Sequence, residues 1–586
     1  MDPINVDFGG KKKRTAQVHP GGSTVKKIIV SLVITLAVAA GLYYFMLPAL
    51  NFKAIELYLY LAVVIFVFIA AFGITSKAYF RPEYMEYAKS KVKIPVILLL
   101  VLAAVVLVGY LSGAVIFRAK SYHNIIDVKE GDFAADVAEI DFSSVPRLDK
   151  DSSNNIATRA LGDLSDYVSQ FVVNGYYSTQ INYKGTPVRV QSLDYGDIFK
   201  WMKNTKNGIP AYIIVDMTNQ KAETVRLENA MKYSPAEHFN EYLIRHVRFN
   251  YPTLMLDTPS FEIDDNGNPY WIVPVLDKTI GLFGGTDVIG AVLVDSVTGD
   301  TTLVSTSLDG NTKLKTDKFV TDDEYQWIDQ VYSANILNQQ YNFYGKYGKG
   351  FINSIIGQSD VKVTSSGYNY LALNDDVYMY TGVTSITSDQ SIIGFVLINQ
   401  RTKEAKYYQV SGALEETART SAQGKVQQYN YTATFPLLLN VSGEPTYFMA
   451  LKDASELVKM YAMVNVKQST VVGVGSTLTE CMSKYAEELE KNGISVNIDV
   501  DSMGDEEDNT AVQKETVDVS GTVAEIRSVI TGGETYFYIK LNEAEPYYKV
   551  AVSQAEKVVI LNVGDAITFT VLKDASGSII PVESVK

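Results

Sequence analysis

Three long apolar runs constrain the fold of this chain more than any other feature of its sequence. They cover residues 28–47, 55–75 and 94–117, and the second holds one charge near its start. A helix that crosses a bilayer needs about 20 mostly apolar residues, and each run supplies them without the polar face of a buried globular helix. A cleaved signal peptide would be shorter and would end in a small-residue cleavage site. The sequence therefore predicts three transmembrane helices over 28–117.

Basic residues in the short flanks predict how these helices are oriented. The N-terminal segment 1–27 and the segment between the second and third runs are rich in Lys and Arg, whereas only Lys53 separates the first run from the second. Cytoplasmic flanks carry the excess of Lys and Arg. We therefore expect a multi-pass protein of the cell membrane with its N-terminus in the cytoplasm and its body outside the cytoplasm. Arg118 and Lys120 oppose this orientation weakly.

The third apolar run contains Gly109 and Gly113 in G-x-x-x-G spacing. Two helix backbones can approach closely at such a pair. The spacing predicts a helix–helix contact, either between the spans of one chain or between chains of a homo-oligomer. Ordinary packing of an apolar helix is the alternative.

Composition limits the class of the remaining chain. The protein has 586 residues, a net charge of −14 and one cysteine, Cys481. The length allows several domains that bury their own cores, and one cysteine excludes an intramolecular disulfide. The acidic balance argues against a general affinity for nucleic acid or anionic lipid.

A repeated phrase organises the body. An apolar strand runs into Asp216, Asp295 or Asn399, a threonine follows within two or three residues, and a polar strand comes next. Asp and Asn favour such turns because their side chains accept bonds from nearby backbone amides. Each copy is therefore predicted to be a β-hairpin, with the acid or amide as a turn residue rather than a catalytic group. We expect several such units to share a core that none can bury alone.

Two of these segments resemble a known module. The stretch DDNGNPYWIVPVLD (264–277), followed by GAVLVDSVTGD (290–300), is similar to PepSY-type repeats, which are small extracytoplasmic α+β units ending in a V-D-x-x-T-G hairpin. The resemblance covers about 223–305 and is weaker over 366–408 and 443–475, where the second unit lacks the glycine. It implies an envelope protein whose repeats bind or restrain other proteins, and it brings no catalytic residues.

The other segments of the body carry coarser expectations. Residues 118–153 are polar and irregular and are predicted to form a stalk before an α+β body over 154–495. Within that body the pattern predicts helices at 154–171, 197–204 and about 223–247, the last interrupted at Pro235. Ser234 to Glu237 has the pattern of a helix N-cap.

The C-terminal part reads as a linker followed by a barrel. Residues 496–514 are acidic and poor in apolar groups, which is typical of a flexible linker, and they lack an ordered calcium loop. Residues 515–586 contain five short β segments, which resemble an OB-type barrel. Such barrels often bind single strands, but this one is acidic, so we expect a structural or protein-binding role and not nucleic-acid binding.

The sequence contains only weak matches to catalytic, metal-binding and cofactor-binding motifs. His238 and His246 lie eight residues apart and do not form the H-E-x-x-H pattern of a zinc site. The stretch VVGVGSTL (471–478) begins like a dinucleotide-binding loop and departs from the pattern at Leu478. Cys481 is expected to be an unreactive thiol. We therefore expect no catalytic residues, no metal and no cofactor, although a triad assembled from distant residues stays open.

A tyrosine-rich stretch, 324–351, is the strongest binding candidate in the sequence. Exposed aromatic side chains among Asn and Gln can stack on sugars and bond to hydroxyls. Packing between the hairpin units is the alternative. The candidate residues for a partner or glycan are Tyr325, Trp327, Tyr332, Tyr341, Tyr344 and Tyr347.

Together these patterns predict a bacterial membrane protein with three N-terminal spans, an extracytoplasmic α+β body and a C-terminal β-barrel. The expected function is that of a non-enzymatic envelope scaffold or regulator that binds a protein or a cell-wall polymer. An accessory subunit of an export, conjugation or DNA-uptake machine is the second hypothesis, and an envelope hydrolase is the third.

Overall fold

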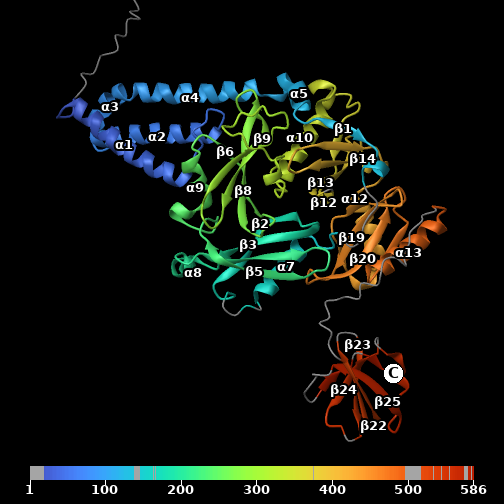
Figure 1. The fold of residues 1–586 in the computed structure, drawn as a ribbon. Helices are drawn as coiled ribbons and strands as arrows, with labels where there is room; N and C mark the ends of the chain where they lie inside the picture. The colour runs from blue at the N-terminus through green and yellow to red at the C-terminus, as the bar shows by residue number, and fades with distance from the viewer. Residues whose placement is uncertain are drawn as a thin grey trace, which may run out of the picture. The chain divides into compact units, whose positions relative to one another are not determined.

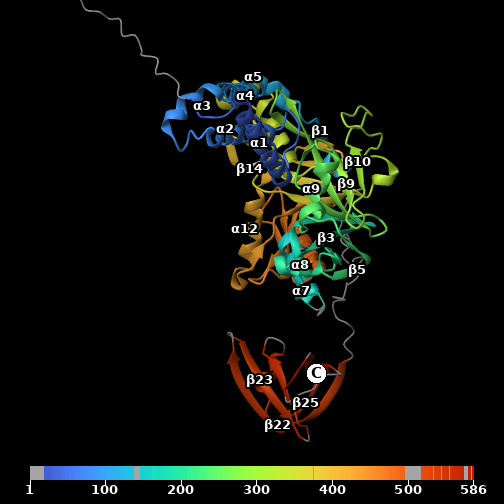
Figure 2. The same cartoon turned by 90° about the vertical axis from the view of Figure 1, so that its left-hand side faces the viewer.

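The structure is a computed structural model, and it forms two compact units, 1–502 and 503–586. It describes residues 19–137, 145–162, 164, 167–373, 375–494, 516–531, 534–542, 544–552, 555–572, 579–582 and 584–585. The predicted acidic linker, 496–514, lies outside the described residues. Each unit is therefore described by itself (Figures 1 and 2).

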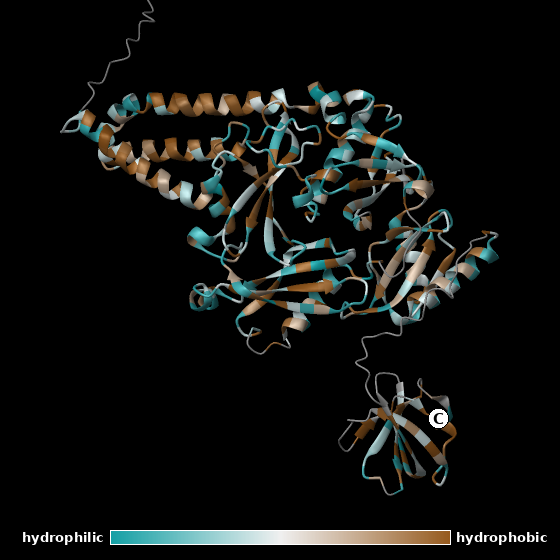
Figure 3. Cartoon of the chain, viewed as in Figure 1, coloured by the Kyte–Doolittle hydropathy of each residue, from teal (hydrophilic) through white to brown (hydrophobic). Residues whose placement is uncertain are grey.

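Three helices are long and apolar enough to cross a membrane: α1 (Thr24–Met46), α2 (Ile55–Thr75) and α4 (Lys93–Ser112). Figure 3 shows the apolar colour running along all three. A short basic helix, α3 (Met85–Lys91), joins α2 to α4. The third helix is shorter than predicted, because Ala114 is extended and a new helix, α5 (Val115–His123), starts after it.

The segment predicted as a stalk is part of the folded body. It contains α5, strand β1 (Val128–Gly131) and helix α6 (Phe133–Asp136). β1 pairs in parallel with β15 (Ala405–Tyr408), so it lies at one edge of a sheet. The expectation of an irregular stalk over 118–153 is therefore wrong for these elements. These elements are rich in polar residues, and composition alone does not distinguish such elements from a loop.

A nine-stranded sheet forms the first half of the body, in the order β10-β9-β8-β7-β2-β3-β4-β5, with β6 paired to β8. Helices α7 (Lys150–Gly162), α8 (Ile198–Asn204) and α9 (Leu243–Asn250) accompany it. Its strands are β2 (Phe171–Tyr183), β3 (Thr186–Tyr195), β4 (Ile209–Asp216), β5 (Ala222–Met231), β6 (Met255–Leu256), β7 (Ser260–Ile263), β8 (Pro269–Ile280), β9 (Gly284–Asp295) and β10 (Thr301–Ser305).

Two smaller sheets complete this unit among the described residues. The seven-stranded sheet has the order β1-β15-β14-β13-β11, with β12 on β13 and β16 on β14, and the five-stranded sheet has the order β17-β19-β20-β21, with β18 on β19. Their elements are α10 (Ala334–Tyr347), α11 (Gly350–Ile355), β11 (Lys362–Thr364), β12 (Asn369–Leu373), β13 (Asp376–Ser385), β14 (Ser388–Asn399), β16 (Gly412–Ala413), α12 (Glu415–Lys425), β17 (Thr432–Ala433), β18 (Leu437–Val441), β19 (Glu444–Lys452), β20 (Val458–Asn465), β21 (Val472–Gly475) and α13 (Leu478–Lys491).

The repeated phrase forms hairpins, as predicted. They are β4–β5, β9–β10 and β14–β15, and each turn begins with the predicted acid or amide. The Asp295 carboxylate accepts bonds from the backbone N–H groups of Val297 (2.8 Å) and Thr298 (2.9 Å). Asn399 uses its side-chain oxygen in the same way on Arg401 (2.8 Å). These side chains are therefore occupied in turns.

Within residues 1–502, neighbouring hairpins share apolar cores. The central strands β8 and β9 are buried on both faces: Trp271, Val273 and Val292 belong to one apolar cluster with β2–β5, whereas Ile272 and Leu293 belong to a second cluster with β13, β14 and α10. Side chains alternate between the two faces of a strand. The hairpin β8–β9 therefore joins the first and second halves of the body.

The helix predicted at 223–247 is wrong over most of its length. Residues 222–231 form β5, the polar second strand of the first hairpin, and the helical residues of this range belong to the 3-10 turn Phe239–Glu241 and to α9. Ser234 does not cap an α-helix, because its hydroxyl accepts the Ala236 N–H within a turn. The helix predicted at 154–171 is α7 in its first half, and β2 begins at Phe171.

The C-terminal unit is a β structure with the strand order β26-β24-β23-β22-β25-β27. The long strand β22 (Thr516–Thr531) pairs with β25 (Ala566–Leu572) through its first half and with β23 (Glu534–Leu541) through its second half. The remaining strands are β24 (Tyr547–Ala551), β26 (Ile579–Pro581) and β27 (Ser584–Val585), and residues 556–560 form a 3-10 helix.

Candidate functional site

The body makes direct contacts with the ends of the three apolar helices, and these contacts are its most distinctive feature. The loop 47–54 between α1 and α2 contacts the body along its length. Leu50 donates its N–H to the Pro252 carbonyl (2.8 Å), and the Asn51 amide donates to the Thr253 carbonyl (3.1 Å). Lys53 pairs with Asp277 (2.7 Å) on β8. The loop is therefore a structural part of the body.

Two buried arginines of α9 hold the C-terminal end of α1. Arg245 donates to the Tyr44 carbonyl (3.0 Å), and its guanidinium lies 4.1 Å from the centre of the Tyr44 ring. Arg248 donates to the Leu47 carbonyl (3.0 Å). The last carbonyls of a helix have no partner within it and carry partial negative charge. Two cations from the body therefore complete the end of this span.

The tip of the hairpin β8–β9, residues 281–285, lies against the ends of α2 and α4. The ring of Phe283 is 5.5 Å from that of Tyr58 and 5.1 Å from that of Tyr110. A Cβ added at Gly109 would lie 2.4 Å from the Phe283 ring, and one at Gly113 would lie 2.9 Å from the Ile280 carbonyl oxygen. The G-x-x-x-G pair thus accommodates a hairpin of the same chain, where the sequence predicts a helix–helix contact.

Replacing Gly113 with alanine is expected to loosen this hairpin tip. Both nearest atoms, the Ile280 oxygen and the Gly284 nitrogen (3.1 Å), belong to backbone and cannot rotate away. Overpacked sites relax by shifting backbone. The measurement is amide hydrogen exchange over residues 279–285 in detergent or nanodiscs, which should become faster. Gly41→Ala in α1, where nothing lies within 4 Å, is the control and should leave exchange unchanged.

The tyrosine-rich stretch is largely internal. Tyr325, Tyr332 and Tyr341 are buried in the second apolar cluster, and Trp327 and Tyr344 pack against it. Tyr347 contacts Tyr122 of α5 with ring centres 6.5 Å apart. The structure therefore places these six side chains in packing between β8–β9, α10 and α5. A role for them in binding a partner or glycan stays a prediction.

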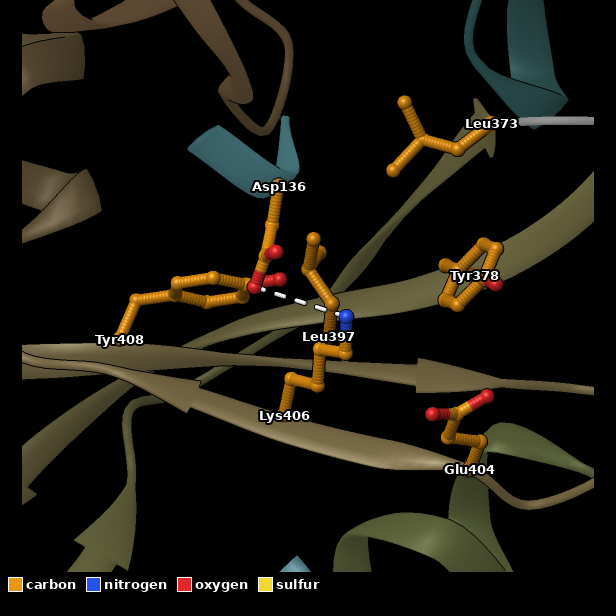
Figure 4. Close-up of a pocket in the computed structure, with 7 residues that line it drawn as sticks. All are labelled: Asp136, Leu373, Tyr378, Leu397, Glu404, Lys406 and Tyr408. Carbon is orange, nitrogen blue, oxygen red and sulfur yellow. Dashed lines mark ion pairs between the residues drawn. The ribbon is translucent and has the colours of Figure 1, made fainter. Parts of the chain in front are cut away.

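The described pockets are small. One lies where α6 faces β12–β15 and has a volume of about 60 Å³, and another, beside residues 146–149, has about 20 Å³. Sites for small organic ligands usually enclose about 300–1,000 Å³. In the first pocket Asp136 pairs with Lys406 (3.5 Å) next to Tyr378, Glu404 and Tyr408 (Figure 4). This shallow polar hollow suits a contact with a larger partner better than an enclosed substrate.

Two buried carboxyl groups lie where the first and second halves of the body meet. Glu262 of β7 accepts the backbone N–H groups of Asp329 (2.9 Å) and Gln330 (3.0 Å). Asp329 accepts the Asn182 N–H (2.7 Å) through one oxygen, whereas its other oxygen has no partner. Burial raises the pKa of Glu262 to about 8 and, together with the charge of Glu262, raises that of Asp329 well above its usual range. Sequence analysis missed this pair because its members are 67 residues apart.

The remaining chemical candidates have structural roles. Cys481 is buried in α13, and burial raises the pKa of its thiol, which disfavours the reactive thiolate. His246 bonds the Gly299 carbonyl (2.7 Å), and His238 lies against the Trp201 ring. Among the described residues, no group of three His, Cys, Asp or Glu side chains could hold a metal ion.

Glycines in the stretch 471–478 serve packing. A Cβ at Gly473 would lie 2.4 Å from the Tyr485 nitrogen, and one at Gly475 would lie 2.2 Å from the Cys481 nitrogen. Strand β21 and helix α13 therefore meet with their backbones nearly in contact. The partial likeness to a dinucleotide-binding loop reflects this close approach.

Comparisons with known proteins do not supply a family. No protein-family model matches the chain, and no curated protein matches it. Among solved structures, a B. megaterium levansucrase mutant is 12% identical, covers 75% of this chain and 92% of its own, and has a TM-score of 0.17. A Bacillus subtilis levansucrase mutant is 9% identical, covers 80% and 94%, and has a TM-score of 0.16. Similarity at that level carries no argument about this protein.

Proposed function

We propose that this protein is a non-enzymatic scaffold or regulator of the bacterial cell envelope. Its three helices hold it in the cell membrane, and its body, outside the cytoplasm, binds an envelope protein or a cell-wall polymer. The PepSY-like character of the hairpin units and the OB-like character of the C-terminal barrel belong to this proposal. The observation that carries it is the attachment of the body to the helix ends.

The attachment favours mechanical coupling over catalysis. The C-terminal ends of α1 and α4 and the N-terminal end of α2 all meet the body, through Arg245 and Arg248, the hairpin tip 281–285 and Lys53. Chains that cross a membrane three times bring these ends to the same side. A partner that binds the body and moves it would therefore also move the ends of the spanning helices. The shallow hollow around Lys406 offers polar and aromatic groups to a large ligand.

The first test is the side of the membrane on which the body lies. Cys481 is replaced with alanine, a single cysteine is placed at residue 502 (S502C), and intact cells are treated with a membrane-impermeant maleimide. We expect labelling before lysis. A matched variant, K12C in the basic N-terminal segment, should label only after lysis. Labelling of S502C only after lysis would place the body in the cytoplasm and contradict the proposal.

The second test separates a scaffold from a hydrolase. Asp136→Asn and Tyr408→Phe, made singly in the hollow of Figure 4, should retain most of the cellular function that deletion of the protein removes, because a contact with a large ligand extends over many side chains. Insertion of a protease site after residue 127, followed by cleavage, should abolish that function only when the body is also released from the contacts that hold it to the helix ends. Loss of function from a single conservative change at one polar side chain would favour catalysis.

A further inference from the structure

An exposed group of apolar side chains lies on the body beside the end of α1. Helix α8 exposes Phe199 (71%) and Met202 (55%), the 3-10 turn Phe239–Glu241 before α9 exposes Phe239 (60%), and α9 exposes Phe249 (55%). Large apolar side chains gathered on one exposed surface mark an interaction site more often than a random surface. We call these four residues the apolar platform.

The platform is held in place by a buried carboxylate. Glu237 accepts hydrogen bonds from the Tyr195 hydroxyl, the Trp201 indole N–H (2.7 Å) and the Thr205 hydroxyl (3.1 Å). Trp201 and Thr205 belong to α8 and its C-terminal cap, whereas Glu237 precedes Phe239 by two residues. The two exposed segments are therefore fixed to each other, and the ring centres of Trp201 and Phe239 are 5.9 Å apart.

The exposed Phe239 of the platform has a strained backbone. Phe239 has a φ of 54° in the left-handed region, which bulky residues rarely adopt. Phe239 is 60% exposed, so its packing against Trp201 offsets only part of this cost. Strain of this kind persists where the surrounding structure imposes it, and it gathers at functional positions.

A continuous set of contacts connects the platform to the membrane helix. Asn240, next to Phe239, accepts a hydrogen bond from the Tyr44 hydroxyl of α1 (3.3 Å). Phe249 lies 6.0 Å from the ring of Tyr43 and 6.3 Å from that of Tyr44. Figures 1 and 2 show α8 and α9 on the side of the body from which the three helices project. The platform therefore borders the end of α1 that meets the body.

Charge around the platform suits a lipid surface. Lys203 and Lys206 are exposed next to Met202, and Lys200 is half-buried beside Phe199. Among the described residues, neither Lys203 nor Lys206 forms an ion pair, and Asp197 caps α8 with its carboxylate on the Phe199 N–H (2.8 Å). Aromatic side chains bordered by lysines are typical of segments that lie in the interfacial region of a bilayer. The net charge of −14 argues against anionic lipid for the chain as a whole, but residues 198–206 carry three lysines and no acid, whereas the exposed Glu241 lies near Phe239.

We propose that the apolar platform inserts into the interfacial region of the same bilayer that α1, α2 and α4 cross. Helix α8 has seven residues and would bind lipid weakly alone. The spanning helices hold it at the membrane surface, so that insertion becomes an intramolecular step at high effective concentration. Apolar side chains enter the acyl boundary while Lys203 and Lys206 meet phosphate groups. The body is thereby held at the membrane by the platform as well as by the spanning helices.

The test uses the full-length protein reconstituted into vesicles of phosphatidylcholine, with and without phosphatidylglycerol. In a Cys481→Ala background, an environment-sensitive fluorophore is attached at F199C and, separately, at M202C. The matched control is Y429C, an exposed aromatic position elsewhere on the same unit. Aqueous iodide and spin-labelled lipid serve as quenchers that report water and acyl chains.

We expect the labels at 199 and 202 to be quenched several-fold more by spin-labelled lipid than the label at 429, and to be shielded from iodide. Lys203→Gln with Lys206→Gln should reduce lipid quenching only in vesicles that contain phosphatidylglycerol. Iodide quenching equal to that at 429 would overturn the proposal. Shielding from both quenchers would also overturn it and would indicate a protein, such as a second copy, on the platform. The result does not depend on which side of the membrane the body occupies.

Discussion

Replacement of Gly475 with alanine is expected to lower the free energy of unfolding of the 1–502 unit by about 2–3 kcal/mol. The new Cβ would lie 2.2 Å from the Cys481 nitrogen and 2.8 Å from its Cα. Both are backbone atoms of α13, so no side-chain rotation relieves the clash and the helix must move away from β21. Cys481, Met482, Tyr485 and Leu489, which α13 buries, would then lose contacts.

The single thiol provides the measurement. Cys481 is fully buried, so a maleimide reaches it only when α13 detaches or the unit unfolds. The labelling rate under native conditions should rise steeply in Gly475→Ala, in parallel with a lower denaturation midpoint. Gly424→Ala is the control, because nothing lies within 4 Å of its Cβ position in α12 and alanine favours helix. An unchanged labelling rate in Gly475→Ala would show that β21 and α13 are not so closely packed.

Neutralising Asp329 is expected to stabilise the body at alkaline pH, which is the reverse of the usual effect of changing a buried residue. Asp329 and Glu262 are both buried, and the charge of Glu262 disfavours ionisation of Asp329. In Asp329→Asn the amide oxygen can keep the bond from the Asn182 N–H while the second negative charge disappears. We expect a gain of about 1–3 kcal/mol at pH 8.

The pH dependence follows from the raised pKa of Glu262. The folded state holds its proton up to about pH 8, whereas the unfolded state releases it near the ordinary value of 4.5. Between these values the folded state binds more protons, so stability is greatest below pH 4.5 for this group and falls as pH rises toward 8. Asp329, whose pKa is also raised, adds to this fall, so chemical denaturation across this range should show a steeper fall in wild type than in Asp329→Asn.

A neighbouring carboxylate gives the opposite sign. Asp376 lies in the same region but pairs with Arg401 (2.6 Å), and both side chains are nearly buried. Asp376→Asn removes a partner from a buried cation and should destabilise the body. If both variants shifted stability in the same direction, general charge effects and not the specific pairings would govern this region.

The sequence predicted the features that depend on local pattern. Length and apolar composition predicted the three apolar helices. The turn residues Asp295 and Asn399, each between an apolar and a polar strand, predicted the hairpins. Both signals lie within about twenty residues of chain. The strand β5 was mistaken for helix because its alternation of Glu and apolar residues is irregular, and its pairing with β4 decides its structure. The pairing of β1 with β15 has no local signal, since the partners are 277 residues apart in register.

The sites that matter most for the proposed function could not be predicted from the sequence, because their residues are far apart in the chain. The G-x-x-x-G pair predicted a close approach, which is present, but only the fold shows that the approaching element is the hairpin tip around Phe283. The apolar platform combines residues of α8, α9 and the segment before it, and each exposed side chain alone would pass as core. Glu262 and Asp329 become a pair only when β7 packs beside residue 329.

The loop 47–54 has a consequence for the order in which the protein is made. Its partners, Arg248, Pro252 and Asp277, are synthesised about two hundred residues after it. Until the ribosome has passed residue 277, the end of α1 and the start of α2 have none of these contacts, although both helices are complete. The final arrangement of the spans is therefore reached late, and a body that misfolds leaves the membrane region unfinished as well.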